Sequence, residues 1–209
     1  MKKFVLWIGL MVLGSLQAQE AVLSPAVKDS IRKELNAYFE AVSNKDWDYV
    51  LDRMPPELFE LEPREKLLKK LKDAQNDYVQ FEIHSPDSIH IFRPSYLKNG
   101  RQYFLAGYIN NATWIFHKKP KETSESFHSR MDYTFYRLHK KMGNKIIRGN
   151  DPGIFHVRVP KYLLIIRDTQ KGKVYFIEYP RQIQKQTDVQ SIVPLEVLQF
   201  FNNTVFHHT

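Results

Sequence analysis

The hydrophobic periodicity of the chain changes near Asp77, and this change restricts the class of fold that it can adopt. Between Ser24 and Lys72 the apolar residues recur at the three- and four-residue spacing of amphipathic helices. From Val79 onward they alternate with polar residues, as in strands that are buried on one face. Helices followed by long antiparallel strands predict an α+β fold, with N-terminal helices packed on an antiparallel sheet.

Local signals place the predicted elements. Ser24 and Pro25 suit the cap and the first position of a helix, and Pro55-Pro56 ends the second helix because proline lacks an amide hydrogen. Asn99-Gly100 predicts a tight turn, since both residues tolerate positive φ angles. The predicted helices cover residues 25–44, 47–54, 63–72 and 194–201. The predicted strands cover residues 79–84, 88–93, 101–118, 127–139, 155–167 and 173–179, with a short strand or strand extension over 145–148.

The long strand over residues 101–118 contains Gly107 and Asn110-Asn111, where a bend or bulge is expected. No repeat, low-complexity segment or linker divides the chain. We therefore predict one domain over residues 19–209.

Residues 1–18 have the organisation of a cleaved secretory signal: two lysines, ten apolar residues over 4–13, and a small-residue exit. The apolar run is about half the ~20 residues that a membrane-spanning helix needs, and no second run of that length follows. We therefore expect export to the periplasm or the extracellular space; an uncleaved N-terminal anchor is the alternative. The chain has no cysteine, so its fold must hold by apolar burial without disulfides or thiolate metal ligands.

Basic residues concentrate in the strand-rich part. Residues 77–209 hold 19 Lys and Arg against 11 Asp and Glu. Such an excess favours anionic partners, such as lipid head groups, acidic glycans or an acidic protein. The alternative is a basic surface that only keeps the protein in solution. No nucleic-acid-binding motif is present, so nucleic acid is not an expected partner.

The segment over residues 37–52, AYFEAVSNKDWDYVLD, resembles the opening of the nuclear-transport-factor-like superfamily. This superfamily of cystatin-like cones includes relatives of ketosteroid isomerases and polyketide cyclases. The resemblance implies a strongly curved antiparallel sheet capped by the N-terminal helices, with a pocket inside the cone. The chain departs from a minimal member by its extra strand length and its C-terminal helix. Members include isomerases, cyclases, dehydratases and non-catalytic binding modules, so the resemblance leaves function open.

Catalytic members of this superfamily place acids, histidines and tyrosines on the concave sheet face. The candidates in this chain are strand residues with apolar neighbours: Glu82, His90, Asp132, His156 and Glu178. An acid that faces the pocket would act as a general base, with a tyrosine donating a hydrogen bond to the developing oxyanion. An acid that faces outward would instead pair with a surface lysine or arginine.

Residues 77–209 also hold 21 of the 28 aromatic residues. These rings either line a pocket for a small apolar or amphipathic ligand or fill the core beneath the helices. The predicted pocket residues are Tyr103, Trp114, Tyr133, Tyr136 and Tyr175. The chain has no metal-binding motif and no glycine-rich phosphate loop, so we expect no metal or cofactor.

The main hypothesis is therefore an exported, non-catalytic module that binds a small apolar or amphipathic ligand or another envelope protein. The first alternative is an acid–base enzyme of the same fold, similar to an isomerase or a dehydratase. The second is a basic protein of surface association or assembly. The resemblance also suggests a homodimer through the exposed sheet face.

Overall fold

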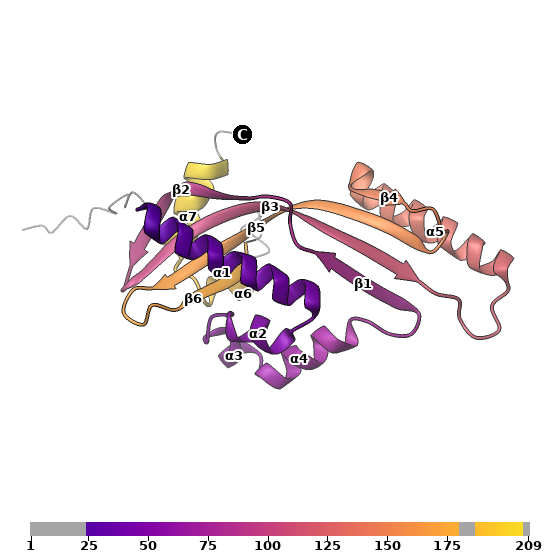
Figure 1. Cartoon of the computed structure of the whole chain (residues 1–209), viewed down its shortest axis with the longest axis horizontal. Helices are drawn as coiled ribbons and strands as arrows, with labels where there is room; N and C mark the ends of the chain where they lie inside the picture. The colour runs from indigo at the N-terminus through magenta and orange to yellow at the C-terminus, as the bar shows by residue number, and fades with distance from the viewer. Residues whose placement is uncertain (1–23, 180–186, 207–209) are drawn as a thin grey trace, which may run out of the picture.

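The computed structural model describes residues 24–179 and 187–206, and it has the predicted α+β architecture. A six-stranded antiparallel sheet, which does not close on itself, is accompanied by N-terminal helices and a short C-terminal helix (Figure 1). The predicted leader over residues 1–18 lies outside the described residues. None of the helices in the described part is long and apolar enough to cross a membrane.

The elements follow in this order. The helices before the sheet are α1 (Pro25–Asn44), α2 (Trp47–Asp52), α3 (Leu58–Leu61) and α4 (Arg64–Asp73). The first three strands are β1 (Val79–His84), β2 (Ile89–Lys98) and β3 (Arg101–Phe116). The segment between β3 and β5 contains α5 (Ser124–Met142), a 3-10 turn (Gly143–Lys145) and β4 (Ile146–Arg148). The chain then forms β5 (Ile154–Asp168), β6 (Val174–Glu178), α6 (Thr187–Gln190), α7 (Leu195–Phe201) and a π-helical turn (Asn202–Phe206).

Two long strands form the centre of the sheet. β3 and β5 pair without a register shift from Arg101 opposite Asp168 to Ile115 opposite Ile154. β2 and β6 flank one half of this pair, and β1 and β4 flank the other half. We call the β2–β3–β5–β6 part the proximal half and the β1–β3–β5–β4 part the distal half. Figure 1 shows both long strands arching near the middle of the molecule.

Helices cover both faces of the proximal half. On one face α1 buries Ile31, Leu35 and Phe39 against residues that include Phe104 and Ile165. On the other face α7 packs against the alternate strand residues. The members of this second cluster include Tyr103, Leu105, Leu164, Ile166, Val197, Leu198 and Phe201. The proximal half therefore has a core on each side of the sheet, one beneath α1 and one beneath α7.

The distal half has a helix on one face. α5 packs Phe127 and Met131 against Ala112, Phe155 and Val157. Because the pairing of β3 with β5 is continuous, these strand residues lie on the same face of the sheet as the residues under α1. None of the hydrophobic clusters in residues 24–179 and 187–206 covers the opposite face of the distal half.

The prediction of a strand over residues 127–139 is wrong, because this segment belongs to α5. The Thr123 hydroxyl caps the helix by accepting a hydrogen bond from the Ser126 amide at 3.1 Å. Gly143, with φ of 58°, ends it. The expected succession of helices and then strands is thus interrupted by a helix inserted between β3 and β4.

Most other predicted elements are confirmed. Ser24 caps α1, and Asn99-Gly100 forms a turn with φ angles of 50° and 73°. β2 continues beyond the predicted end at residue 93, and the irregular pairing lies there, between Ile91 and Ser95, instead of in β3. The short helix α3 was not predicted.

Candidate functional site

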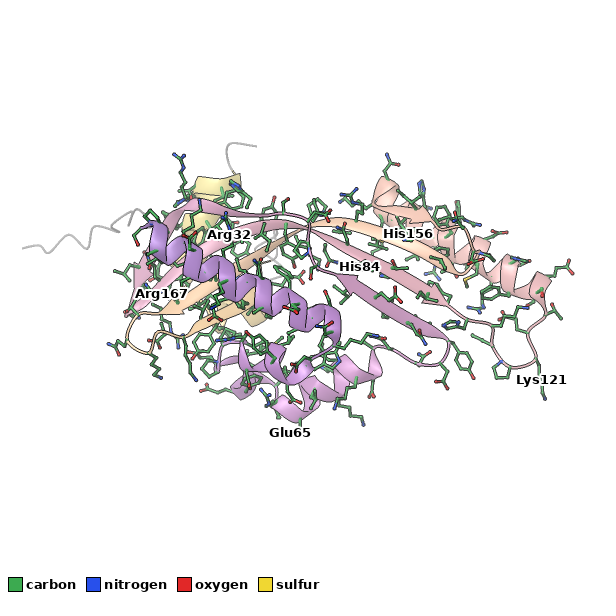
Figure 2. All side chains as sticks on the ribbon, in the orientation of Figure 1. Arg32, Glu65, His84, Lys121, His156 and Arg167 are labelled. Atoms are coloured by element: carbon green, nitrogen blue, oxygen red, sulfur yellow. The ribbon has the colours of Figure 1, made fainter. Side chains whose placement is uncertain are left out.

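The candidate site is the helix-free face of the distal half, which we call the open face. The strand residues that point to this side alternate with those under α5. They are Gln80, Glu82, His84, Asn111, Thr113, Ile115, Ile147, Ile154, His156 and Arg158. Figure 2 labels His84 and His156, both in the distal half. Glu82, His84, Ile147, His156 and Arg158 are exposed, and the remaining β3 and β5 residues that face this side are half-buried.

Thr113 lies at the centre of a polar row that joins three strands. Its Oγ1 atom lies 3.0 Å from Nε2 of His84 and 3.4 Å from Nδ1 of His156. A hydroxyl donates one hydrogen bond and accepts others, so Thr113 can bridge the two rings, and the tautomer of each ring decides which atom is the donor. Glu82 lies directly opposite Thr113 in the pairing of β1 with β3. The row therefore combines a carboxylate, a hydroxyl and two imidazoles at the surface.

A second polar row runs beside the first. Nε of Arg158 donates to Oδ1 of Asn111 at 3.2 Å, and Nδ2 of Asn111 donates to a carboxylate oxygen of Asp87 at 3.5 Å. Arg158 is exposed, and its guanidinium carries further N–H donors besides the one in this hydrogen bond. These two rows offer donors and acceptors in fixed positions across the open face.

Two hollows flank the open face. One, of about 460 Å³, lies between the end of α1 and the strand β1, and its lining includes Lys45, Glu82 and His84. The other, of about 240 Å³, lies over Gly107, where the rings of His90 and Phe92 pack edge to face at 4.8 Å. A Cβ atom on Gly107 would lie 3.3 Å from the Phe92 ring, so this glycine lets the rings approach the sheet closely.

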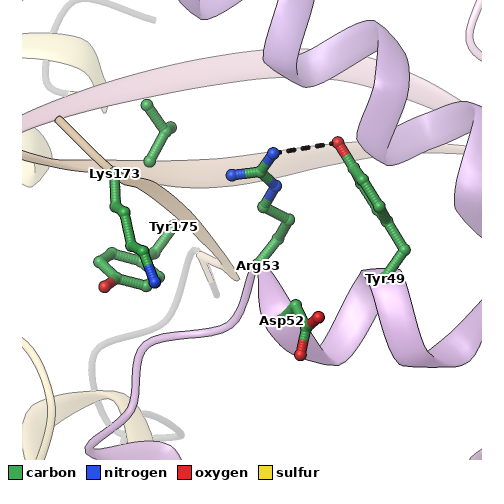
Figure 3. A pocket seen from close by; sticks show the side chains of 6 residues that line it. Tyr49, Asp52, Arg53, Lys173 and Tyr175 are labelled. Atoms are coloured by element: carbon green, nitrogen blue, oxygen red, sulfur yellow. Dashed lines mark hydrogen bonds between the residues drawn. The ribbon is translucent and has the colours of Figure 1, made fainter.

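A third pocket, of about 390 Å³, lies away from the open face, between α2 and β6 (Figure 3). Arg53 donates to the Tyr49 hydroxyl at 3.2 Å and pairs with Glu34 at 2.8 Å. Lys173 and Asp52 complete its charged lining. Because Arg53 is already neutralised by Glu34, this pocket makes a weaker anion site than its composition suggests.

The structure separates the predicted acids and histidines. Glu82 and His156 lie on the open face, and His90 lines the hollow over Gly107. Asp132, on α5, pairs with Arg148 at 2.7 Å. Glu178 pairs with Lys161 at 2.5 Å and lies on the side of the sheet that carries α1. Two of the five candidates therefore share one surface.

Glu178 nevertheless lies near two tyrosines. Burial and the nearby Glu178 carboxylate raise the pKa of Tyr38 to about 12, and the same two causes raise the pKa of Tyr108. Both phenols therefore stay protonated and act as hydrogen-bond donors. The side chain of Glu178 is 59% exposed and already ion-paired, so it lacks the dry surroundings that would make it a strong base.

The five predicted pocket aromatics do not come together. Tyr103 and Tyr175 are buried in the core beneath α7, and Trp114 packs beside Phe81 on the α5 side of the sheet. Tyr133 and Tyr136 are 62% and 63% exposed on α5. The assumed strand over 127–139 had placed these two on the sheet, and as helix residues they point away from it.

No protein-family model matches this sequence, and no curated protein matches it. Within the described part of the chain, no group of three or more His, Cys, Asp or Glu is placed to hold a metal ion.

Sequence reasoning found only Glu82 and His156 on the open face and missed its other members, among them His84, Asn111, Thr113 and Arg158. Asn111, Thr113 and Arg158 occupy alternate strand positions between residues that face the other side of the sheet, and His84 ends β1 on the same alternation. The alternation is visible in the sequence, but which of the two sets of residues is left uncovered depends on the face against which α5 packs.

Proposed function

We propose that this chain is an exported, non-catalytic binding protein that holds another envelope protein against its open face. The observation that carries this proposal is the combination, on one helix-free face, of the Thr113-centred polar row with the apolar side chains of Ile115, Ile147 and Ile154. Ile147 is 56% exposed, which leaves apolar area for a partner to cover.

The dimensions of the open face suit a protein partner. From Gly107 to Phe116, β3 extends about 33 Å at about 3.3 Å per residue. Neighbouring strands lie about 4.8 Å apart, and β1 and β4 widen the β3–β5 pair over only six and three residues. The resulting footprint of about 450 Å² is over half of the ~800 Å² that each partner contributes to an ordinary specific interface.

Exposure favours binding over chemistry. Glu82, His84 and His156 are all solvent-exposed, where electrostatic stabilisation of a transition state is weak. The described hollows beside the open face are also open to solvent, and this favours a macromolecule over an enclosed small ligand.

An acid–base enzyme is the second candidate. It is favoured by one observation, the convergence of Glu178 with the protonated phenols of Tyr38 and Tyr108. Membership of the nuclear-transport-factor-like superfamily, with its cone-shaped sheet, also remains a proposal. It is supported by the succession of α1, α2 and α4 before an antiparallel sheet, and α5 would be an addition to that plan.

Site-specific photocrosslinking in the cell that exports the protein tests the proposed function. Benzoylphenylalanine replaces Ile147 or His156 on the open face, and Leu61 on α3 serves as the control because it is similarly exposed, at 51%. We expect an adduct of one defined mass from Ile147 and His156 but not from Leu61. In a second variant, Thr113→Arg places a long charged side chain at the centre of the face and should abolish the adduct at Ile147 while the circular dichroism spectrum is unchanged.

Two results would contradict the proposal. The first is an equal yield of adducts from the open face and from Leu61. The second is a small molecule that native mass spectrometry finds bound to the purified chain and that Tyr38→Phe, but not Thr113→Arg, displaces. That outcome would move the function to the Glu178 cluster.

A further inference from the structure

We infer that the outer surface of α5 docks on an anionic lipid surface. This inference does not depend on the proposed function, because α5 covers one face of the distal half and the open face is the other. A chain that lies on a membrane through α5 would turn its open face away from the lipid. Figure 1 shows α5 as an outer layer of the distal half.

The outer surface of α5 carries two tyrosines and two cations in one strip. Tyr133, Tyr136, Arg137 and Lys140 follow the spacing that places residues on the same side of a helix. The strip lies opposite Phe127 and Met131, which face the sheet. All four side chains of the strip are exposed. They therefore form a continuous aromatic and basic surface.

The two tyrosines are unusual in their exposure. At 62% and 63% they are the most exposed large hydrophobic side chains of the described residues. The guanidinium of Arg137 lies 5.8 Å from the centre of the Tyr133 ring. A tyrosine with an apolar ring and a polar hydroxyl is typical of the membrane–water boundary, where one end is apolar and the other is hydrated.

The positive charge of α5 favours an anionic lipid surface. α5 has four Lys or Arg and two acidic residues, and one of the two, Asp132, is paired with Arg148 at 2.7 Å. Glu125, the other, lies in the first turn, away from the strip at the end of the helix. Lysines and arginines close to a bilayer are attracted by anionic head groups. The strip covers residues 133–140 of α5, about 12 Å of a straight helix that a flat lipid surface can follow.

The shape of the strip favours lipid over a protein. The strip is the convex outer side of a helix, and none of the hollows described above includes its residues. Protein interfaces also use aromatic side chains and arginine as hot spots, and these usually fill a pocket of the partner. The experiment must therefore distinguish an anionic lipid surface from an acidic protein.

Vesicle sedimentation tests the inference. The chain is purified from the soluble fraction after export, and mass spectrometry identifies its N-terminus. The probes are vesicles of phosphatidylcholine alone and vesicles with about one third phosphatidylglycerol. We expect the chain to pellet with the anionic vesicles at about 0.1 M salt, and much less at about 0.5 M salt, because salt screens the attraction.

Two pairs of substitutions divide the contributions. Arg137→Glu with Lys140→Glu should lower partitioning onto anionic vesicles by about tenfold or more, since each basic residue near the surface contributes to binding. Tyr133→Ser with Tyr136→Ser should lower it several-fold at both salt concentrations. Lys66→Glu with Lys69→Glu, which reverses two charges on the exposed side of α4, is the control and should change partitioning by less than about twofold.

Three results would overturn the inference: equal pelleting with neutral and anionic vesicles, equal losses in the α4 control, and partitioning that neither α5 pair alters. Retention on immobilised polyglutamate without pelleting on vesicles would assign the strip to an acidic protein instead. Unchanged circular dichroism and unfolding midpoints in all variants would show that the fold persists, since none of the changed residues faces the core.

Discussion

The substitution Gly153→Ala is expected to destabilise the distal half of the molecule. Gly153 is buried in the loop before β5, and its carbonyl oxygen accepts a hydrogen bond from the Phe116 amide at 2.8 Å. A Cβ atom at this position would overlap the carbonyl oxygen of Phe116 and would lie 2.8 Å from Cζ of Phe127. The first neighbour is backbone at the end of β3 and the second is a ring that anchors α5. One added methyl group therefore forces the strand and the helix apart.

The magnitude follows from the nature of these two neighbours. Overpacking a well-filled core costs about 1–3 kcal/mol, and the upper part of this range applies because sheet pairing holds the Phe116 oxygen in place. Alanine gains about 0.4–1 kcal/mol by restricting the unfolded chain. We expect a net loss of about 2 kcal/mol in the free energy of unfolding. For a chain of this size that loss corresponds to a decrease of about 4–8 °C in the melting temperature.

Urea unfolding followed by circular dichroism measures this loss, with Gly107→Ala as the matched control. At Gly107 the added Cβ would meet ring carbons of Phe92 at 3.3 Å and of Tyr162 at 3.4 Å, and these rings can move slightly. We expect the control to change the free energy of unfolding by less than about 1 kcal/mol. If Gly153→Ala were as stable as the unsubstituted chain, α5 and the end of β3 could not pack around this loop as described.

Two further predictions concern pH. Hydrogen bonds from Arg130 and from the Lys119 amide lower the pKa of Glu122 from 4.5 to about 2. The stabilising contribution of Glu122 is therefore present above about pH 4.5 and disappears as the pH falls towards 2. Glu122→Gln should make the melting temperature depend less on pH over this range, and an unchanged acid profile would contradict the assignment. Burial, and then the charge of Glu178, raise the pKa of Tyr38 from 10.0 to about 12, so stability should fall as the pH rises from about 10 to 12. Tyr38→Phe should weaken this alkaline loss, and a profile as steep as that of the unsubstituted chain would refute the burial of the phenol.

The elements that were predicted correctly are those with strong local signals. Ser24 and Pro25 begin α1, and Asn99-Gly100 forms the turn between β2 and β3. In each case the conformational preference of the residue decides the local structure without help from distant contacts. β2 was predicted to end at residue 93, whereas it continues to Lys98, and a pairing irregularity between Ile91 and Ser95 accommodates Pro94 within the strand.

The helix α5 was missed because its composition resembles a strand. Tyr133, Phe135 and Tyr136 favour β structure, and their density in the sequence concealed the helical spacing. That spacing is present in the buried residues and their neighbours: Phe127, Met131, Phe135, Leu138 and Met142 all face the sheet. Thr123 and Gly143 also mark the beginning and the end of the helix in the sequence. The error arose because the β propensity of the aromatic residues was given more weight than the helical spacing of the apolar residues.

The open face could not be predicted from the sequence, because it depends on pairing between distant strands. Glu82, Thr113 and His156 lie on β1, β3 and β5, and they adjoin only because β3 pairs with both neighbours in this register. A shift of one residue in either pairing would turn one of them to the other side of the sheet. Alternation in one strand shows that two faces exist, whereas only the tertiary structure shows which face the helix covers.

Alternate residues of β3 have different roles: one set packs against α5 and stabilises the fold, and the other set belongs to the polar rows of the open face. Stability and binding therefore depend on different residues of the same strand. On β3 the side chains of Ala112 and Trp114 pack towards α5, while Asn111 and Thr113 point to the open face. An antiparallel sheet covered on one side is stable with its other face in water, so the polar residues are not required for the fold. Substitutions at Ala112 and Trp114 should therefore lower stability, whereas substitutions at Asn111 and Thr113 should leave it nearly unchanged. If the open face binds a partner, the second pair should weaken binding at constant stability, which a face that is only solvated would not show.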